Sequence, residues 1–143
     1  MILFDNNDIK ELIREVFGTD EDLCTRRHHG EVKTLDGLVD YAMDSLFDGV
    51  GSVTVFYYGD RLGFAAIDLG IPLIRSFGIK KEHRDKKHLF WEAVEDVVGE
   101  KYYAAVWSDN RNARRFFEEH DGVLMSEMGG GVLYEFKNKN ICR

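Results

Sequence analysis

A run of basic side chains precedes one of the expected helices and could bind an anion. Five lysines and arginines fall within eight positions: Lys80, Lys81, Arg84, Lys86 and Lys87, with His83 among them and His88 directly after them. A helix N-terminus attracts phosphate because its first backbone N–H groups and the helix dipole face the anion. These side chains would add positive charge at the same place. Two interpretations stay open, a phosphate-binding site and an ordinary solvated helix start.

Other motifs that carry chemistry are scarce. His28 with His29, and His83 with His88, lack the Cys or carboxylate partners at ligand spacing that a zinc site requires, so no metal site is predicted. The sequence has no HExxH, G-x-S-x-G, P-loop or G-x-G-x-x-G motif, and hydrolase, NTPase and dinucleotide-binding functions therefore have no support. The acidic residues 20–22 are expected to form a solvated, charged loop.

The composition is that of one compact domain over residues 1–143. Hydrophobic residues make up 44% of the chain, which is enough for a core, and no linker-like or repeated segment interrupts it. A net charge of −7 argues against nucleic acid and anionic membrane as partners. No apolar stretch is long enough for a signal peptide or a membrane span. Cys24 and Cys142 stand far apart outside any CxxC motif, which favours a cytoplasmic location.

Apolar residues at helical spacing predict four helices. Asp8, with Glu11 three residues later, fits a capping box for a first helix that ends at Gly18. Thr34 is expected to cap a second helix, and Gly99 to end a third. The apolar faces of the second and third run from Leu35 to Leu46 and from Leu89 to Val98. A fourth helix begins at Asn110 or Asn112 and has Ala113, Phe116, Phe117 and His120 on one face.

Strand-like segments lie between these helices. A short strand is expected at residues 2–4, and the others at 52–58, 61–69, 73–79, 102–107, 123–128 and 132–136. The order is β-α-α-β-β-β-α-β-α-β-β. A right-handed crossover makes strands 73–79 and 102–107 parallel neighbours. The fold class predicted is therefore α/β, with a mixed sheet of six to seven strands and helices on both faces.

This order, and the segment after strand 73–79, resemble the GCN5-related N-acetyltransferase (GNAT) family over nearly the whole chain. In that family the strand runs into a loop of the form V-x-x-x-x-(Q/R)-G-x-G-x-(G/A), whose backbone N–H groups hold the pyrophosphate of acetyl-CoA. Arg84 stands at the Gln/Arg position, whereas Asp85, Lys87 and Leu89 replace the glycines. The resemblance is thus to a degenerate member in which side-chain charge would have to neutralise the phosphates.

A second family motif, N-x-x-A-x-x-x-Y-x-x-x-G-F, matches at Asn110 and Ala113. Phe117 stands where many members have a tyrosine that protonates the departing CoA thiolate, and a phenyl ring cannot donate a proton. Phe116 and Phe117 are expected to pack in the core. The helix is also similar to one in small tailed-phage proteins with GNAT-like sequences, among them an internal virion protein, through an Asn, an Arg-Phe pair and a Gly before a strand.

The resemblance implies acetyl-CoA as the cofactor and direct attack of a substrate amine on its thioester. A backbone N–H near residues 77–79 would polarise the carbonyl, where the family strand separates from its neighbour. The general base expected is Glu82 or His83, with Asp68 as a third candidate. Cofactor contacts are expected from Phe77, Gly78, Ile79, Arg84, Lys86, Lys87, His88 and Asn110.

Two functions follow from this pattern. The first is a GNAT-like N-acetyltransferase whose substrate is a small-molecule or protein amine, and the acidic composition suits a basic amine. The alternative is a catalytically inactive GNAT-like scaffold, which would bind a protein partner or take part in assembly, as a phage virion component for example. A homo-oligomer is left open.

Overall fold

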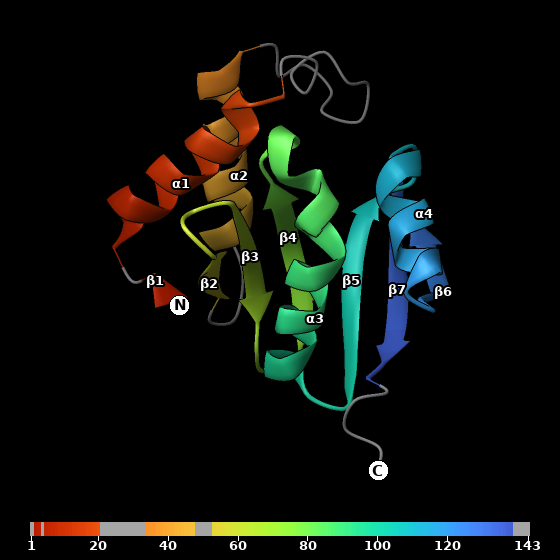
Figure 1. Cartoon of the computed structure of the whole chain (residues 1–143). Helices are drawn as coiled ribbons and strands as arrows, with labels where there is room; N and C mark the ends of the chain where they lie inside the picture. Colours follow the sequence, from red (N-terminus) through yellow and green to blue (C-terminus); the bar gives the residue numbers. More distant parts are fainter. Residues whose placement is uncertain (1, 4, 21–33, 48–52, 139–143) are drawn as a thin grey trace.

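The computed structural model describes residues 2–3, 5–20, 34–47 and 53–138 of the chain (Figure 1). Cys24, Cys142, and the pair His28 and His29 lie outside these ranges, so the expectations placed on them stay predictions. None of the described helices is both long and apolar enough to cross a bilayer.

A mixed sheet of seven strands organises the described residues (Figure 1). Parallel pairing joins β4 to β5 near the middle of the sheet, and every other neighbouring pair is antiparallel. This confirms the predicted element order and the predicted crossover. In sheet order the strands are β1 (Ile2–Leu3), β2 (Val53–Tyr58), β3 (Gly63–Asp68), β4 (Leu73–Ile79), β5 (Lys101–Trp107), β7 (Gly131–Lys137) and β6 (Val123–Met128).

Four α-helices cover the sheet in two pairs, and each pair closes a hydrophobic core. The pair α1 (Asn6–Gly18) and α2 (Leu35–Phe47) packs on β2 and β3 through side chains such as Phe64. The pair α3 (Lys87–Val98) and α4 (Arg111–Glu119) packs on β5 and β7, with Trp91 at the centre of an aromatic cluster. Burial of these apolar faces is the main driving force for the fold.

The helix starts differ from expectation at two places. The N-cap of α1 is Asp5, whose side chain accepts a hydrogen bond from the Asn7 N–H, so Asp8 lies in the first turn and the predicted capping box is wrong. A 3-10 helix, η3 (Lys81–Lys86), precedes α3 where a loop was expected. Thr34 caps α2 as predicted, because its Oγ1 accepts from the Gly37 N–H.

Strands β4 and β5 separate along their length, and this opens the sheet at one end (Figure 1). Among the described residues they pair only at Leu73 with Tyr103 and Ile74 with Ala104. The register of β3 against β4 shifts next to this point, so that Arg75 is an extra residue on β4. Such a bulge bends a strand and increases its twist. The rest of β4 therefore runs away from β5.

Candidate functional site: a cleft between two diverging strands

A cleft of about 730 Å³ lies where β4 and β5 separate. Its walls are β4 along its whole length, the end of β5, η3 and the start of α3, the first two turns of α4, and parts of α1 and α2. The lining is mostly apolar, with a few charged side chains, which is the usual character of a small-molecule site. Of the sequence-predicted residues, those that line the cleft are Phe77, Gly78, Ile79, Arg84, Lys87 and Asn110.

Arg84 enters the cleft wall from η3 and is held there by a carboxylate of α1's C-terminal end. Its Nη2 donates to Asp20 Oδ2 at 2.7 Å, and the Asp20 side chain is only 6% exposed. Asp20 was expected in a solvated loop, and that expectation is wrong because Arg84, 64 residues away, pairs with it in the fold. The Lys81 N–H also donates to Thr19 Oγ1, at 2.9 Å. Two hydrogen bonds thus fix η3 to the end of α1.

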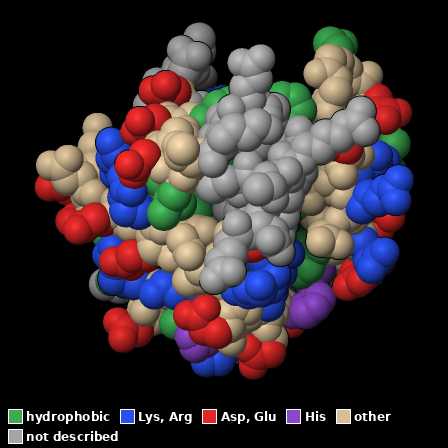
Figure 2. Space-filling view, turned by 90° about the horizontal axis from the view of Figure 1, so that it is seen from above, with side chains coloured by type: hydrophobic (Ala, Val, Ile, Leu, Met, Phe, Trp, Pro, Cys, Tyr) green, Lys and Arg blue, Asp and Glu red, His purple; other side chains and the backbone are tan. Residues whose placement is uncertain are grey.

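Lys87 supplies a second positive charge at the start of α3. Its Nζ lies 4.3 Å from the centre of the Phe116 ring, a cation–π contact. No side-chain cap bonds the first turn of α3, whose N-cap is Lys86. Seen from above, Lys and Arg side chains lie at several places on this face of the molecule, with Asp and Glu side chains among them and His side chains near its edge (Figure 2). Positive side chains and a helix N-terminus therefore meet at the cleft mouth, an arrangement that favours an anion.

One side of the cleft is built on packed aromatic rings. Phe77 of β4 stacks on Phe90 at 4.7 Å and on Phe116 at 5.9 Å between ring centres. Phe116 and Phe117 are 5% and 6% exposed, which confirms their predicted burial. Phe117 packs edge-on against Tyr134 and Phe136. The position that the GNAT motif gives to a tyrosine is therefore filled here by a core side chain without a proton to donate.

Asn110 begins α4, which settles the choice between Asn110 and Asn112. Its Oδ1 accepts from the Ala113 N–H at 3.2 Å, an N-cap hydrogen bond that satisfies one of the orphan donors of the helix. Both asparagines line the cleft.

The remaining predicted residues lie at or beyond its edges. Glu82 and His83 are on η3, beside the cleft but not among the residues that line it, and Glu82 is exposed. Asp68 pairs with Leu73, at the start of β4, whereas η3 follows the end of β4. Its Oδ1 accepts from the Gly70 N–H. The structure thus does not bring Asp68 together with Glu82 and His83.

His88 points to the far end of α4 instead of into the cleft. Its Nδ1 lies 2.8 Å from His120 Nε2, and both rings contact Phe116. Burial, and then the proximity of His88, lower the pKa of His120. Among the described residues, no group of three or more His, Cys, Asp or Glu side chains could hold a metal ion.

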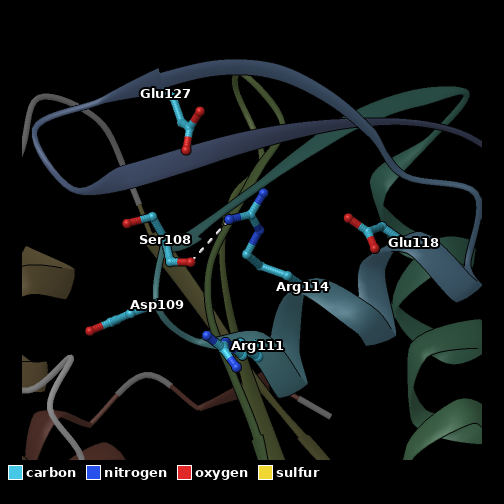
Figure 3. A pocket seen from close by; sticks show the side chains of 6 residues that line it. All are labelled: Ser108, Asp109, Arg111, Arg114, Glu118 and Glu127. Carbon is cyan, nitrogen blue, oxygen red and sulfur yellow. Dashed lines mark hydrogen bonds between the residues drawn. The ribbon is translucent and has the colours of Figure 1, made fainter.

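A second, more open pocket of about 520 Å³ lies between α4 and the β6–β7 hairpin (Figure 3). Arg114 points into it and donates to the Ser108 carbonyl and the Tyr134 hydroxyl, which in turn donates to Glu118. The hydrogen bond to Tyr134 ties the hairpin to α4 and raises the pKa of Arg114. The lining carries both signs of charge: Ser108, Asp109, Arg111, Arg114, Glu118 and Glu127. We assign this pocket a structural role.

Several polar and aromatic side chains line the cleft although the sequence analysis did not propose them as site residues. They are Asp20, Tyr41, Arg75, Ser76, Trp107 and Asn112. A polar residue inside a strand, such as Arg75, was the available signal, because a half-buried strand position that carries charge is unusual.

The architecture described above, a seven-stranded mixed sheet flanked by four helices, is that of the GNAT acetyltransferases. An acetyltransferase from Thermus thermophilus is 19% identical over 96% of both chains, with a TM-score of 0.65. A probable GNAT-family acetyltransferase from Chromobacterium violaceum is 11% identical over 96% of this chain and 86% of its own, with a TM-score of 0.64. No protein-family model and no curated protein matches the sequence.

A third similar structure was solved with a ligand. It is a putative acetyltransferase from Salmonella typhimurium with its cofactor acetyl-CoA, 12% identical over 97% of this chain and 94% of its own, with a TM-score of 0.57. At these identities the likeness concerns the fold.

Proposed function

We propose that the chain acts as a single GNAT-like domain that binds acetyl-CoA in this cleft and transfers the acetyl group to an amine. The observation that carries the proposal is the separation of β4 from β5 directly beside the basic start of α3. A diverging pair of parallel strands leaves room for the extended arm of acetyl-CoA. The positive charge at the cleft mouth suits the phosphates of the same molecule. Structurally similar acetyltransferases support the same proposal.

The residues present fit coenzyme A in two respects. Arg84 and Lys87 would neutralise the pyrophosphate as side chains, in place of the glycine-lined backbone of the family motif. The apolar wall of Phe77, Val106 and Phe116 would contact the thin arm that leads to the thioester. Bound in this way, the cofactor would supply an acetyl group activated as a thioester.

Catalysis would rest on the edge of β4 that faces the cleft. Beyond Ile74 the described part of β4 pairs with β3 alone, so its main-chain N–H groups near Gly78 are placed to polarise a carbonyl. The amine nitrogen would form the new N–C bond as the C–S bond of the thioester breaks. The electron pair of the C–S bond would go to sulfur. Glu82 or His83, beside the cleft, would receive the amine proton, directly or through water.

The leaving thiolate needs no acid at the position of Phe117. Thiols ionise near pH 8–9, so a thiolate is an adequate leaving group close to neutral pH. A protonating tyrosine would add to the rate, and its absence here predicts slow turnover.

Burial of Phe117 in the aromatic core also supports a second candidate, a catalytically inactive GNAT-like scaffold. In that case the cleft would bind acetyl-CoA without turnover, or not at all, and the chain would act through a protein partner.

A thermal-shift titration with acetyl-CoA at low salt tests the proposal. Ligand at 100 times its dissociation constant is expected to stabilise the fold by about 2.7 kcal/mol. Arg84→Gln and Lys87→Gln should reduce the shift, whereas Lys10→Gln, on the outer face of α1 where Lys10 pairs with Asp40, should leave it unchanged. Release of free thiol with a panel of amines then separates the two candidates. Absence of any shift at low salt would refute cofactor binding.

A further inference from the structure

We propose that the acceptor is an amine that also carries a carboxylate, of the amino-acid class with an apolar side chain, and that Arg75 binds the carboxylate. This inference rests on the proposed function and names the substrate class that the same cleft accepts. Arg75 lies on a part of the cleft wall that the two GNAT motifs do not cover.

Arg75 is a half-buried cation without a counter-ion among the described residues. It is the extra residue of the β4 bulge, and it lines the cleft. No ion pair or hydrogen bond joins its guanidinium to another of the described side chains, whereas Arg14, Arg61 and Arg84 each pair with a carboxylate. A charge that is partly removed from water needs a partner of opposite sign. A guanidinium matches a carboxylate through two parallel hydrogen bonds.

The described lining of the cleft has an excess of positive charge. Its cations are Arg75, Arg84 and Lys87, and its carboxylate is Asp20, which already pairs with Arg84. Arg84 and Lys87 lie at the start of α3, where the phosphates of the cofactor are proposed to bind, whereas Arg75 is nearer the start of β4. The charge of Arg75 is therefore left for the second substrate. It favours an anionic group there, although the whole chain has a net charge of −7.

Binding through the carboxylate leaves the amine nitrogen free to react. Arg75 and Gly78 are on the same strand, about 10 Å apart at roughly 3.3 Å per residue. An arginine side chain and an α-amino acid are together long enough to span this separation, so the neutral nitrogen can meet the thioester carbonyl that is polarised near Gly78. The bond changes are those of the proposed function. The N–C bond forms, the electron pair of the C–S bond goes to sulfur, and the amine proton goes to Glu82 or His83, directly or through water.

The wall beside Arg75 is apolar, which sets the side chain of the acceptor. The two helix pairs lie on opposite faces of the sheet. Trp107 is three residues after Ala104, which is buried under α3 and α4, so Trp107 is on the face that α1 and α2 share. Leu38 and Tyr41 of α2 line the cleft as well, and Trp107 and Tyr41 are each 40% exposed. A side chain that covers this wall gains roughly 25 cal/mol for each Å² of apolar surface removed from water.

The experiment compares three acceptors that differ in the carboxylate, at saturating acetyl-CoA and pH 8. They are L-phenylalanine, L-phenylalaninamide, in which a neutral group of similar shape replaces the carboxylate, and phenethylamine, which lacks it. We expect L-phenylalanine to have a kcat/KM at least about tenfold above the other two, the least that a charge-assisted contact is worth. The amide has the least basic amine, so a preference over it cannot arise from amine ionisation. Equal use of the three, or better use of phenethylamine or spermidine, would overturn the proposal.

Variants of Arg75 assign the preference to its guanidinium. Arg75→Gln should lower kcat/KM for L-phenylalanine about 10- to 100-fold, mainly through KM, and leave that for phenethylamine unchanged. Arg75→Lys should lie between, because it keeps the charge and loses the paired donors. Arg115→Gln is the matched control, since Arg115 is exposed on α4 and does not line the cleft. An equal loss for both acceptors in Arg75→Gln would show a structural role and refute the contact.

A binding measurement tests the carboxylate contact without turnover. The expected product, N-acetyl-L-phenylalanine, carries the carboxylate, and N-phenethylacetamide is the same molecule without it. In calorimetry the wild-type chain should bind the first more tightly than the second, and Arg75→Gln should not distinguish them. Equal affinity of the wild-type chain for the two compounds would refute the contact.

The acetyl-CoA thermal shift keeps the two proposals distinguishable. A wild-type chain without any shift refutes the proposed function itself. A chain that shows the shift but has no preference for L-phenylalanine refutes this inference alone. If Arg75→Gln reduces the shift and leaves the ratio of L-phenylalanine to phenethylamine unaltered, Arg75 contacts the cofactor and its proposed role is refuted. Where the variant melts early, the ratio measured on the wild-type chain still tests the substrate class.

Discussion

His88 Nδ1 and His120 Nε2 lie 2.8 Å apart and join the first turn of α3 to the end of α4. In a hydrogen bond between these two ring nitrogens, one must carry a proton and donate while the other accepts. The hydrogen bond is lost when both nitrogens are protonated. The carboxylates of Glu92, Glu119 and Asp121 raise the pKa of His120. Burial and the proximity of His88 lower it by more, so the pKa of His120 is below its usual value. The pair therefore couples the packing of α3 on α4 to pH.

This coupling predicts a loss of stability in mild acid. The unfolded His120 has a pKa of about 6.5, and in the folded chain it is lower, so the folded state binds fewer protons near that pH. The contribution is fully present above pH 6.5 and is lost as the pH falls from there toward the folded pKa. Urea melts at pH 7.5, 6.5 and 5.5 should show a smaller decline for His120→Gln than for wild type. His83→Gln, a change outside the pair, is the control. Equal declines in all three proteins would show that His120 does not contribute to the pH dependence.

Phe116 is predicted to be the most costly truncation on α4. It is 5% exposed and contacts the rings of Phe77, Trp91 and His120 at 5.9, 5.3 and 4.5 Å between centres. Phe116→Ala should lower the free energy of unfolding by about 3–5 kcal/mol, because it removes buried surface and leaves a cavity. Phe116→Leu should cost clearly less. Urea denaturation measures both, and a loss under about 1 kcal/mol for the alanine variant would contradict the packing.

Gly63 is predicted to tolerate no side chain, although its backbone is in an ordinary strand conformation. A Cβ there would lie 2.5 Å from the Gly78 carbonyl oxygen, 3.1 Å from the Phe90 ring and 3.2 Å from the Ile79 Cα. Two of these neighbours are backbone of β4, so relief requires the strand to shift. Gly63→Ala should therefore cost about 1–3 kcal/mol in thermal or urea unfolding.

Gly18→Ala is the matched control for that substitution. The nearest atom to a Cβ at Gly18 is Leu35 Cδ2 at 3.5 Å, an ordinary contact, and the residue is the last of α1. Alanine has a higher helix propensity than glycine, so this variant should be neutral or more stable by up to about 1 kcal/mol. Equal losses in the two variants would argue against a steric cause at Gly63.

The fold could be predicted because its information is local. Alternating and helical spacing gave the order of strands and helices, and the handedness of a crossover made β4 and β5 parallel. The 3-10 helix η3 gave no such signal, since Lys81–Lys86 is polar throughout, and its first N–H bonds to Thr19, which is 62 residues away in the chain.

Part of the cleft lining could be predicted, for a related reason. Arg84, Lys87 and Asn110 lie at fixed spacings from the start of a helix, and the sequence shows such spacings directly. Asp20 has no local signal of this kind, because its role depends on a partner 64 residues away. His88 likewise was expected to contact the cofactor, but it does not line the cleft and contacts His120, 32 residues further along the chain. Long-range pairs of this kind follow from tertiary packing, and a single sequence does not reveal them.

The last prediction concerns how the proposed cofactor site holds its anion. In a glycine-lined loop, backbone amides bind phosphate at short range, whereas here Asp85, Lys87 and Leu89 occupy the glycine positions and the charge comes from side chains. Exposed charges are screened over about 10 Å at 0.1 M salt.

Acetyl-CoA affinity, measured by calorimetry, should therefore fall steeply between 50 mM and 500 mM NaCl. In Lys87→Gln the affinity should be lower at 50 mM and its dependence on salt shallower, since one screened contact has gone. Arg84→Gln should behave in the same way. Asp85→Asn should bind more tightly at low salt, because it removes a carboxylate from the same turn. An affinity that does not change with salt in any of these proteins would mean that the backbone at the start of α3, rather than Arg84 and Lys87, holds the phosphates.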